Sequence, residues 1–356
     1  MKAYSFLGHL VSWFSLLLVV ACGRSSAATG NSAVERDARI AQDMKGLIAA
    51  ELVRWRESSQ KVQALAPSAG RGWSATEDAG ALRDMRLAWG SGREAYELIE
   101  GAIAATFPES DAATDARYDD FLARLGAQGD ANAFDGAGVV GMHAIERVLW
   151  AQEIQEDVVR FERGLSGYRA ARYPESAVEA QAFKEQLAGR LVADIVELER
   201  AFTPLELDVA FAFQGLIDLA AEQVEKVDRA ATGQEESRYA QTTMRDLRAN
   251  YRGCLSAYRV FEPWVKKTSG GAALDKRVLA AFSRLEAAYA AVKGDSIPRP
   301  PSGWSSISPQ PEHAESAFGQ LYMVVKRESD PARAGSLTAE LYAVARALEL
   351  QGVVMK

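Results

Sequence analysis

The residues of this chain that could do chemistry centre on His143 and Glu146, which stand three positions apart in the segment 141–150. Side chains with this spacing share one face of a helix. The surrounding positions suit a buried helix: Val139, Val140, Met142, Ile145, Val148 and Leu149. We therefore expect the imidazole and the carboxylate to point inward, where a polar group needs a partner and an ion can supply one. A hydrogen bond between the two side chains within the core is the structural alternative.

Histidines are too few to build a metal site from imidazoles alone. His9 lies in a predicted leader and His313 stands beside Pro311 at a loop-to-helix junction, so only His143 has a buried helical setting. Carboxylates would have to complete the site. One imidazole with two or three carboxylates suits ferrous or ferric iron, manganese or zinc, and the residue types do not choose among these metals.

Several acids could supply those carboxylates, and the residues themselves leave their roles open. Glu235 and Glu236 lie in a turn between two predicted helices, where acids commonly face solvent and favour the positive end of the helix dipole. Glu97 and Glu100 stand three apart on a half-apolar helix, which is as consistent with an outward as with an inward direction. The acids with the weakest signal lie in acidic turns, and these are Asp115, Asp119, Asp120 and Asp157.

The first residues have the pattern of a secretory leader. Lys2 is followed by an apolar run, and small residues at 19–21 directly precede Cys22. The run is short for a membrane span. This ending resembles a lipobox, so we predict a signal peptide over 1–21, a lipidated Cys22 and a flexible tether over 22–33. An ordinary cleaved signal with an incidental cysteine is the alternative. Either way, we expect the protein in the cell envelope, in the periplasm or anchored to the outer membrane.

The composition excludes some functions. A chain cleaved before Cys22 keeps 40 basic and 48 acidic side chains, a net charge of −8, which makes nucleic acid a poor partner. Once Cys22 is lipidated only Cys254 is left, so no internal disulfide can form and stability must come from helix packing. The remaining chain, about 335 residues long, exceeds the usual size of one core and favours two domains.

Helical periodicity dominates the chain, and no run alternates with the period of a strand. We predict an all-α protein of two antiparallel helical bundles, 34–170 with the His143 motif and 171–356. The proline-rich stretch 296–311 is the one long loop. The predicted helices cover 34–66, 75–106, 118–125, 141–150, 150–168, 174–203, 205–231, 239–267, 272–293, 312–327 and 332–351.

Five segments together resemble a known family. The segment 141–150 resembles the Gly-x-His-x-x-Glu signature of imelysin-like proteins. Further segments resemble their branch of periplasmic iron-uptake proteins of the EfeO/EfeM type. These are Arg-x-x-Tyr-Glu-x-Ile-Glu at 93–100, the acidic turn at 115–120, Thr-Gly-Gln-Glu-Glu-Ser-Arg-Tyr at 232–239 and Asp-Leu-Arg-Ala-Asn at 246–250. The resemblance covers most of the chain after the leader and implies an imelysin-like fold with the signature helix near the interface of two bundles.

The resemblance also implies a function, the capture and transfer of a metal ion, with iron favoured and zinc as the other candidate. It implies metal ligation by His143, Glu146 and Glu236, with Glu97 as a fourth ligand. Supporting roles fall to Glu100, Asp115, Glu235, Arg238 and Tyr239, among which Arg238 would balance charge. The partners it implies are the lipid membrane, through Cys22, and an iron permease.

Two departures from the family pattern bear on these expectations. Longer members carry a cupredoxin-like domain before the helical part, and we expect none here because the first predicted helix follows the tether closely. Gln234 stands where the family often has an acid. Any redox handling of iron by such a domain is therefore not expected of this chain.

Two other functions compete with metal capture. A metallopeptidase of the common zinc type uses His-Glu-x-x-His, whereas Ala144 and Arg147 stand where its glutamate base and second histidine would be. A surface-binding helical bundle without a metal is the other alternative. It would be indicated by aromatic side chains lining the largest groove and by His143 lying apart from that groove.

Overall fold

The computed structural model describes residues 25–67 and 70–355, and every regular element in these ranges is a helix. The all-α prediction is therefore confirmed. The predicted signal peptide and Cys22 lie outside the described residues. None of the helices described has both the length and the apolar character that a membrane crossing requires.

Residue contacts divide the chain into a unit ending at Arg39 and a unit formed by 40–356. The described part of the first unit is the beginning of helix α1 (Ser25–Leu65). This helix starts within the stretch 22–33 that we predicted as a tether. After residue 40, α1 buries Ile40, Met44 and Ile48 at intervals of four, as the sequence periodicity predicted.

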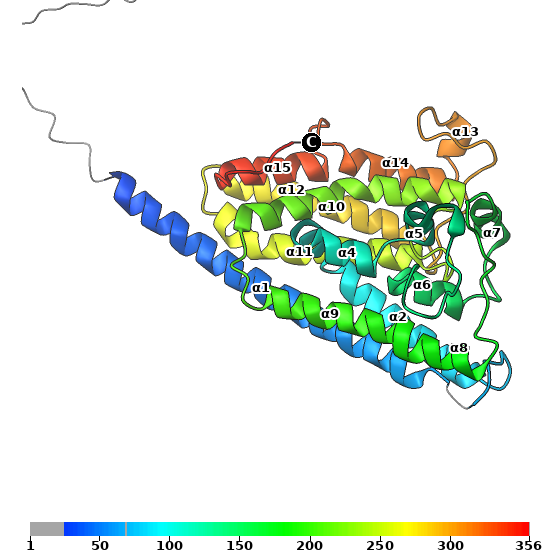
Figure 1. The fold of residues 1–356 in the computed structure, drawn as a ribbon. Helices are drawn as coiled ribbons and strands as arrows, with labels where there is room; N and C mark the ends of the chain where they lie inside the picture. Colours follow the sequence, from blue (N-terminus) through cyan, green and yellow to red (C-terminus); the bar gives the residue numbers. More distant parts are fainter. Residues whose placement is uncertain (1–24, 68–69, 356) are drawn as a thin grey trace, which may run out of the picture. The chain divides into compact units, whose positions relative to one another are not determined.

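The remaining elements belong to the second unit (Figure 1). The first half contains α2 (Ala79–Glu97), α3 (Glu100–Thr106), α4 (Pro108–Thr114), α5 (Tyr118–Leu125), η1 (Gly126–Gln128), α6 (Gly141–Leu149) and α7 (Glu156–Arg163). The second half contains α8 (Ala177–Ala182), η2 (Phe183–Leu187), α9 (Ala188–Phe202), α10 (Val209–Arg229), η3 (Ala230–Thr232), α11 (Thr243–Val265), α12 (Gly271–Ala291), α13 (Pro311–Ala314), α14 (Ala317–Ser329) and α15 (Leu337–Ala347).

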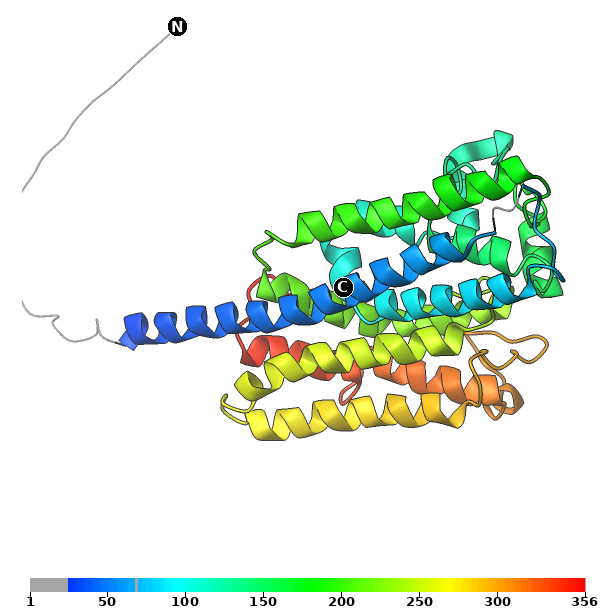
Figure 2. The ribbon, with the colours of Figure 1, turned by 90° about the horizontal axis from the view of Figure 1, so that it is seen from below.

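Helix α9 lies along the part of α1 after residue 40 and runs in the opposite direction (Figure 2). The Lys45 ammonium donates to the carbonyls of Thr203 and Leu205 at 2.9 and 2.7 Å, and Arg56 pairs with Glu199 at 2.6 Å. Ring packing between α1 and α2 adds a third neighbour, because the Trp55 and Tyr96 centroids are 5.0 Å apart. These three helices form a layer on one side of the second unit.

Five helices, α10, α11, α12, α14 and α15, pack against one another on the other side of this unit (Figure 1). Contacts of α2 with α11 join them to the first layer, and α3 packs against α10. Elements from the two halves of the chain are thus interleaved. The predicted division at residue 170 stays a prediction.

One helix near the motif departs from the prediction. The chain does not stop being helical at Pro108, because this proline occupies the first position of α4, where its missing N–H is no loss. We predicted that the helix 75–106 ends just before this proline, and the proline opens the next helix. Helix α4 ends at Thr114, so the next residue, Asp115, lies beside α6, which carries the His143 motif.

Candidate metal centre

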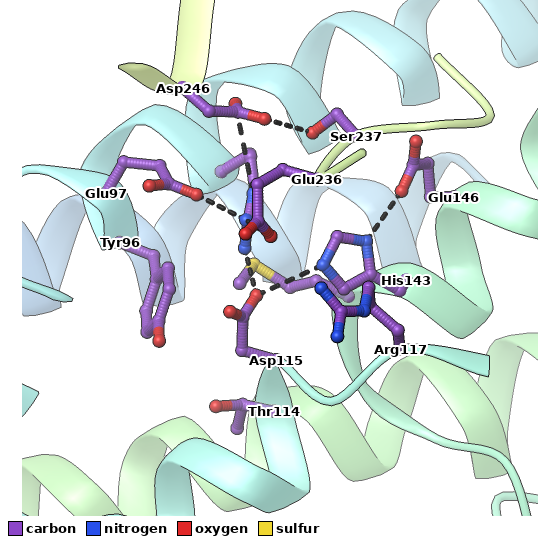
Figure 3. A network of polar contacts seen from close by, with 12 residues as sticks. Tyr96, Glu97, Thr114, Asp115, Arg117, His143, Glu146, Glu236, Ser237 and Asp246 are labelled. Carbon is purple, nitrogen blue, oxygen red and sulfur yellow. Dashed lines mark hydrogen bonds and ion pairs between the residues drawn. The ribbon is translucent and has the colours of Figure 1, made fainter. Parts of the chain in front are cut away.

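The start of α6 fixes the position of the motif. Gly141 has a φ of +82°, and a Cβ at this position would lie 2.6 Å from the carbonyl oxygen of Thr114. Only glycine therefore allows the backbone of α6 to approach the end of α4 this closely. The close approach places Asp115, the residue after Thr114, beside His143 (Figure 3).

His143 points inward as predicted and is 1% exposed. Its Nδ1 lies 2.7 Å from Glu146 Oε2, and its Nε2 lies 3.4 Å from Asp115 Oδ1. This Nε2 has no hydrogen-bond partner in the described part of the chain. Burial and the Arg93 guanidinium lower the pKa of His143, but the carboxylates of Asp115 and Glu146 outweigh them and raise it to about 9.

Glu146 is fully buried and both of its oxygens are engaged. Oε1 accepts hydrogen bonds from the backbone N–H groups of Tyr239 and Ala240 at 2.9 and 2.8 Å, while Oε2 faces His143 Nδ1. A carboxylate held in this way keeps the proton on Nδ1, so Nε2 is the atom that can bind a metal once it has lost its own proton. It is also not free to act as the base of a peptidase.

Three residues bring potential ligand atoms together, namely Asp115, His143 and Glu236, whose atoms all lie within 4.8 Å of one another. They come from the end of α4, from α6 and from the turn before α11, and Figure 3 shows them converging. Burial raises the pKa of Glu236, yet Lys226 and Arg93 lower it to about 2, so this carboxylate is ionised at neutral pH. Two carboxylates and one imidazole form a donor set that suits iron, manganese or zinc.

Glu97 and Glu100, which we predicted as a ligand and as a supporting residue, lie beside these three residues and pair with cations. Glu97 forms an ion pair with Arg93 and accepts a hydrogen bond from Asn250 at 2.5 Å. Both oxygens of Glu100 accept from the Lys226 ammonium at 2.7 Å. Burial raises the pKa of Glu97 well above its ordinary value. Both side chains point inward, which the helix periodicity had left open.

The turn residues predicted to support the site are buried rather than exposed. Glu235 accepts a hydrogen bond from Gln241 at 3.0 Å, and burial raises its pKa to about 7. Arg238 pairs with Asp119 and lies over the Phe161 ring. Tertiary packing, which local periodicity does not describe, encloses this turn.

Three charged residues close to Asp115, His143 and Glu236 are not among the site residues predicted from the sequence, namely Arg93, Lys226 and Asp246. Asp246 accepts from the Ser237 hydroxyl at 2.5 Å, and burial raises its pKa to about 6. Lys226 follows Leu219 by seven positions on the buried face of α10. A lysine on an apolar helix stripe was the available signal, because a buried ammonium requires acidic partners.

Comparison with known proteins settles the family. The family model of imelysin, peptidase family M75, matches residues 51–320. The chain belongs to the imelysin family.

Curated relatives of this imelysin-family chain carry the name iron uptake system component EfeO. The proteins of Escherichia coli O157:H7 and Shigella flexneri are each 24% identical to it over 191 residues. The protein of Escherichia coli O1:K1 is 25% identical over the same length. Each match covers 54% of this chain and 40% of the relative. The chain thus aligns with less than half the length of these relatives.

Proposed function

We propose that this chain captures a metal ion, iron first among the candidates, and passes it on for uptake. The observation that carries the proposal is the buried Nε2 of His143, which lacks a hydrogen-bond partner among the described residues and faces Asp115 and Glu236. An unpartnered buried polar atom is costly, and a bound ion would satisfy it. The names of the EfeO relatives support iron as the cargo.

Within this proposal, Asp115, His143 and Glu236 hold the ion. Glu146, which we predicted as a ligand, orients the imidazole instead, because its oxygens already accept from His143 and from two backbone N–H groups. Glu97, predicted as a fourth ligand, holds Arg93. We further propose that lipidation at Cys22 anchors the protein in the cell envelope and that an iron permease receives the cargo.

The first test is titration calorimetry on protein freed of metal by a chelator. We expect ferrous iron, added without oxygen, and zinc each to bind at one site. His143→Ala should weaken this binding at least about 100-fold, which is more than the effect of removing a group that only orients a ligand. His313→Ala, which changes the other histidine of the described chain, is the matched control and should bind like the wild type. Equal binding by His143→Ala and the wild type would contradict the proposal.

A second candidate function rests on a groove of about 790 Å³ between α7, η3 and the proline-rich loop. Phe161 and Trp304 line it, and His143 does not. This is the arrangement expected of a surface-binding bundle, with aromatic side chains to pack against a ligand. Soluble polysaccharide fragments tested by calorimetry should bind the wild type and lose affinity with Trp304→Ala. If no such fragment binds, this second function fails and the metal proposal is unaffected.

A further inference from the structure

Two buried cations, Arg93 and Lys226, lie against the carboxylates that would hold the metal. The Arg93 side chain is 1% exposed, forms an ion pair with Asp115 and lies 3.5 Å from Glu236 Oε2. The Lys226 ammonium is 3.8 Å from Glu236 Oε1. Arg93 therefore contacts both of the carboxylates in the proposed ligand set.

A guanidinium in this position opposes metal binding in two ways. It shares the oxygens of Asp115 and Glu236, and its charge repels an incoming cation across a buried region, where screening by water and salt is weak. A site built only for tight retention would place no permanent positive charge there. Arginine keeps its charge throughout the physiological pH range, so this opposition cannot be removed by losing a proton.

Two further acids, which are not in the proposed ligand set, also contact Arg93. Glu97, one helical turn along α2, pairs with the same guanidinium, and Asp246 Oδ1 lies 3.9 Å from Arg93 Nε. That Asp246 oxygen has no hydrogen-bond partner in the described ranges. Glu97 and Asp246 would therefore remain as partners of Arg93 if Asp115 and Glu236 bound a metal ion.

We propose that Arg93 is an internal counter-ion that competes with the metal for Asp115 and Glu236 and thereby keeps the affinity low enough for release. The inference rests on the proposed metal-binding function. In this proposal Arg93 sets the metal affinity. Glu97 and Asp246 hold the Arg93 side chain while the ion is bound.

The test compares metal affinity and stability in Arg93→Gln, Arg93→Lys and the wild type, with zinc and anaerobic ferrous iron as probes. Arg93→Gln should melt at a lower temperature without metal, because buried acids lose their counter-ion. It should nevertheless bind the metal at least about 10-fold more tightly, because a nearby positive charge is gone. Arg93→Lys keeps the charge and should stay within about 3-fold of the wild-type affinity.

The matched control is Arg284→Gln, which removes another arginine from a buried acid, Glu328, between α12 and α14, two helices that supply none of the proposed ligands. It should lower the melting temperature and leave metal affinity unchanged. Unchanged or weaker binding by Arg93→Gln would overturn the inference, since a purely structural arginine gives that result. If Arg93→Gln is unfolded without metal, added zinc should restore its helical circular dichroism, and no restoration would also overturn the inference.

The two proposals fail separately in these measurements. If His143→Ala abolishes binding while Arg93→Gln does not strengthen it, metal capture stands and the role of Arg93 falls. If the wild type binds neither metal, both proposals fall.

Discussion

Two buried charged regions of this protein differ in how completely their polar atoms are satisfied. Around Glu328, on α14, every carboxylate oxygen is used: Oε1 accepts from Arg284 and Arg327 at 2.6 and 2.9 Å. Oε2 accepts from Arg284 and from the Leu337 backbone N–H at 2.9 and 3.0 Å. Around His143, by contrast, His143 Nε2, Arg93 Nε and Asp246 Oδ1 have no hydrogen-bond partners within the described ranges.

The difference separates a structural ion pair from a region suited to a ligand. Buried polar atoms in folded proteins almost always have partners, so a group of unpartnered atoms in one place requires an explanation. The Glu328 region is complete and joins α12, α14 and the start of α15. The His143 region is incomplete, and a cation bound at His143 Nε2 would give that nitrogen a partner. Substitutions in the first region should therefore change stability alone, and those in the second should change metal binding.

The largest expected effect is on stability in the completed region. Glu328→Ala leaves the Arg284 guanidinium and the Leu337 N–H without their acceptor, and we expect the free energy of unfolding to fall by about 3–5 kcal/mol. Urea unfolding measures the loss, and calorimetry should show unchanged metal affinity. Glu312→Ala, at an exposed acid, is the control. A loss of less than about 1 kcal/mol would contradict the structural role of the pair.

A substitution at the start of α6 should affect both stability and metal binding. Gly141→Ala introduces a Cβ at a positive φ and 2.6 Å from the Thr114 carbonyl oxygen, so α4 and α6 must separate. We expect the free energy of unfolding to fall by about 2–3 kcal/mol. The metal should also bind more weakly, because Asp115 moves away from His143. Thermal unfolding and calorimetry measure the two effects.

Gly46→Ala is the control for that change, since no atom lies within 4 Å of the added Cβ in α1. It should be neutral or slightly stabilising. If Gly141→Ala behaves in the same way as Gly46→Ala, the close approach of α4 and α6 does not position the metal centre.

The smallest expected effect sharpens the assignment of Glu146. Glu146→Gln keeps the shape of the side chain but weakens the hold on the His143 Nδ1 proton, and we expect metal affinity to fall about 10–100-fold. Glu153→Gln, at an acid on the surface after α6, is the matched control. Unchanged affinity would show that Glu146 does not orient the imidazole. Complete loss of binding would instead favour the direct ligand role predicted from the sequence.

The sequence predicted the helices better than it predicted the roles of the acids. Periodicity and helix-ending residues located α5 at 118–125 and α6 to within one residue of its end. The inward direction of His143 also followed from the apolar residues around it, and it is confirmed by burial. Glu97, Glu100 and Glu236 could not be oriented in this way, because acids in turns and on half-apolar helices face solvent or core according to what packs over them.

Local sequence therefore determined that this is an all-helical chain of the imelysin family, with a buried histidine and glutamate on one helix face. Those properties depend on residues within a few positions of one another, which is why periodicity and short motifs record them. Tertiary structure alone decided that Asp115 and Glu236 meet His143, and that Arg93 and Lys226 lie against them. These contacts join residues from 10 positions apart, Lys226 and Glu236, to 143 positions apart, Arg93 and Glu236, and they lie on different helices or turns. Such charges meet only after the helices have packed.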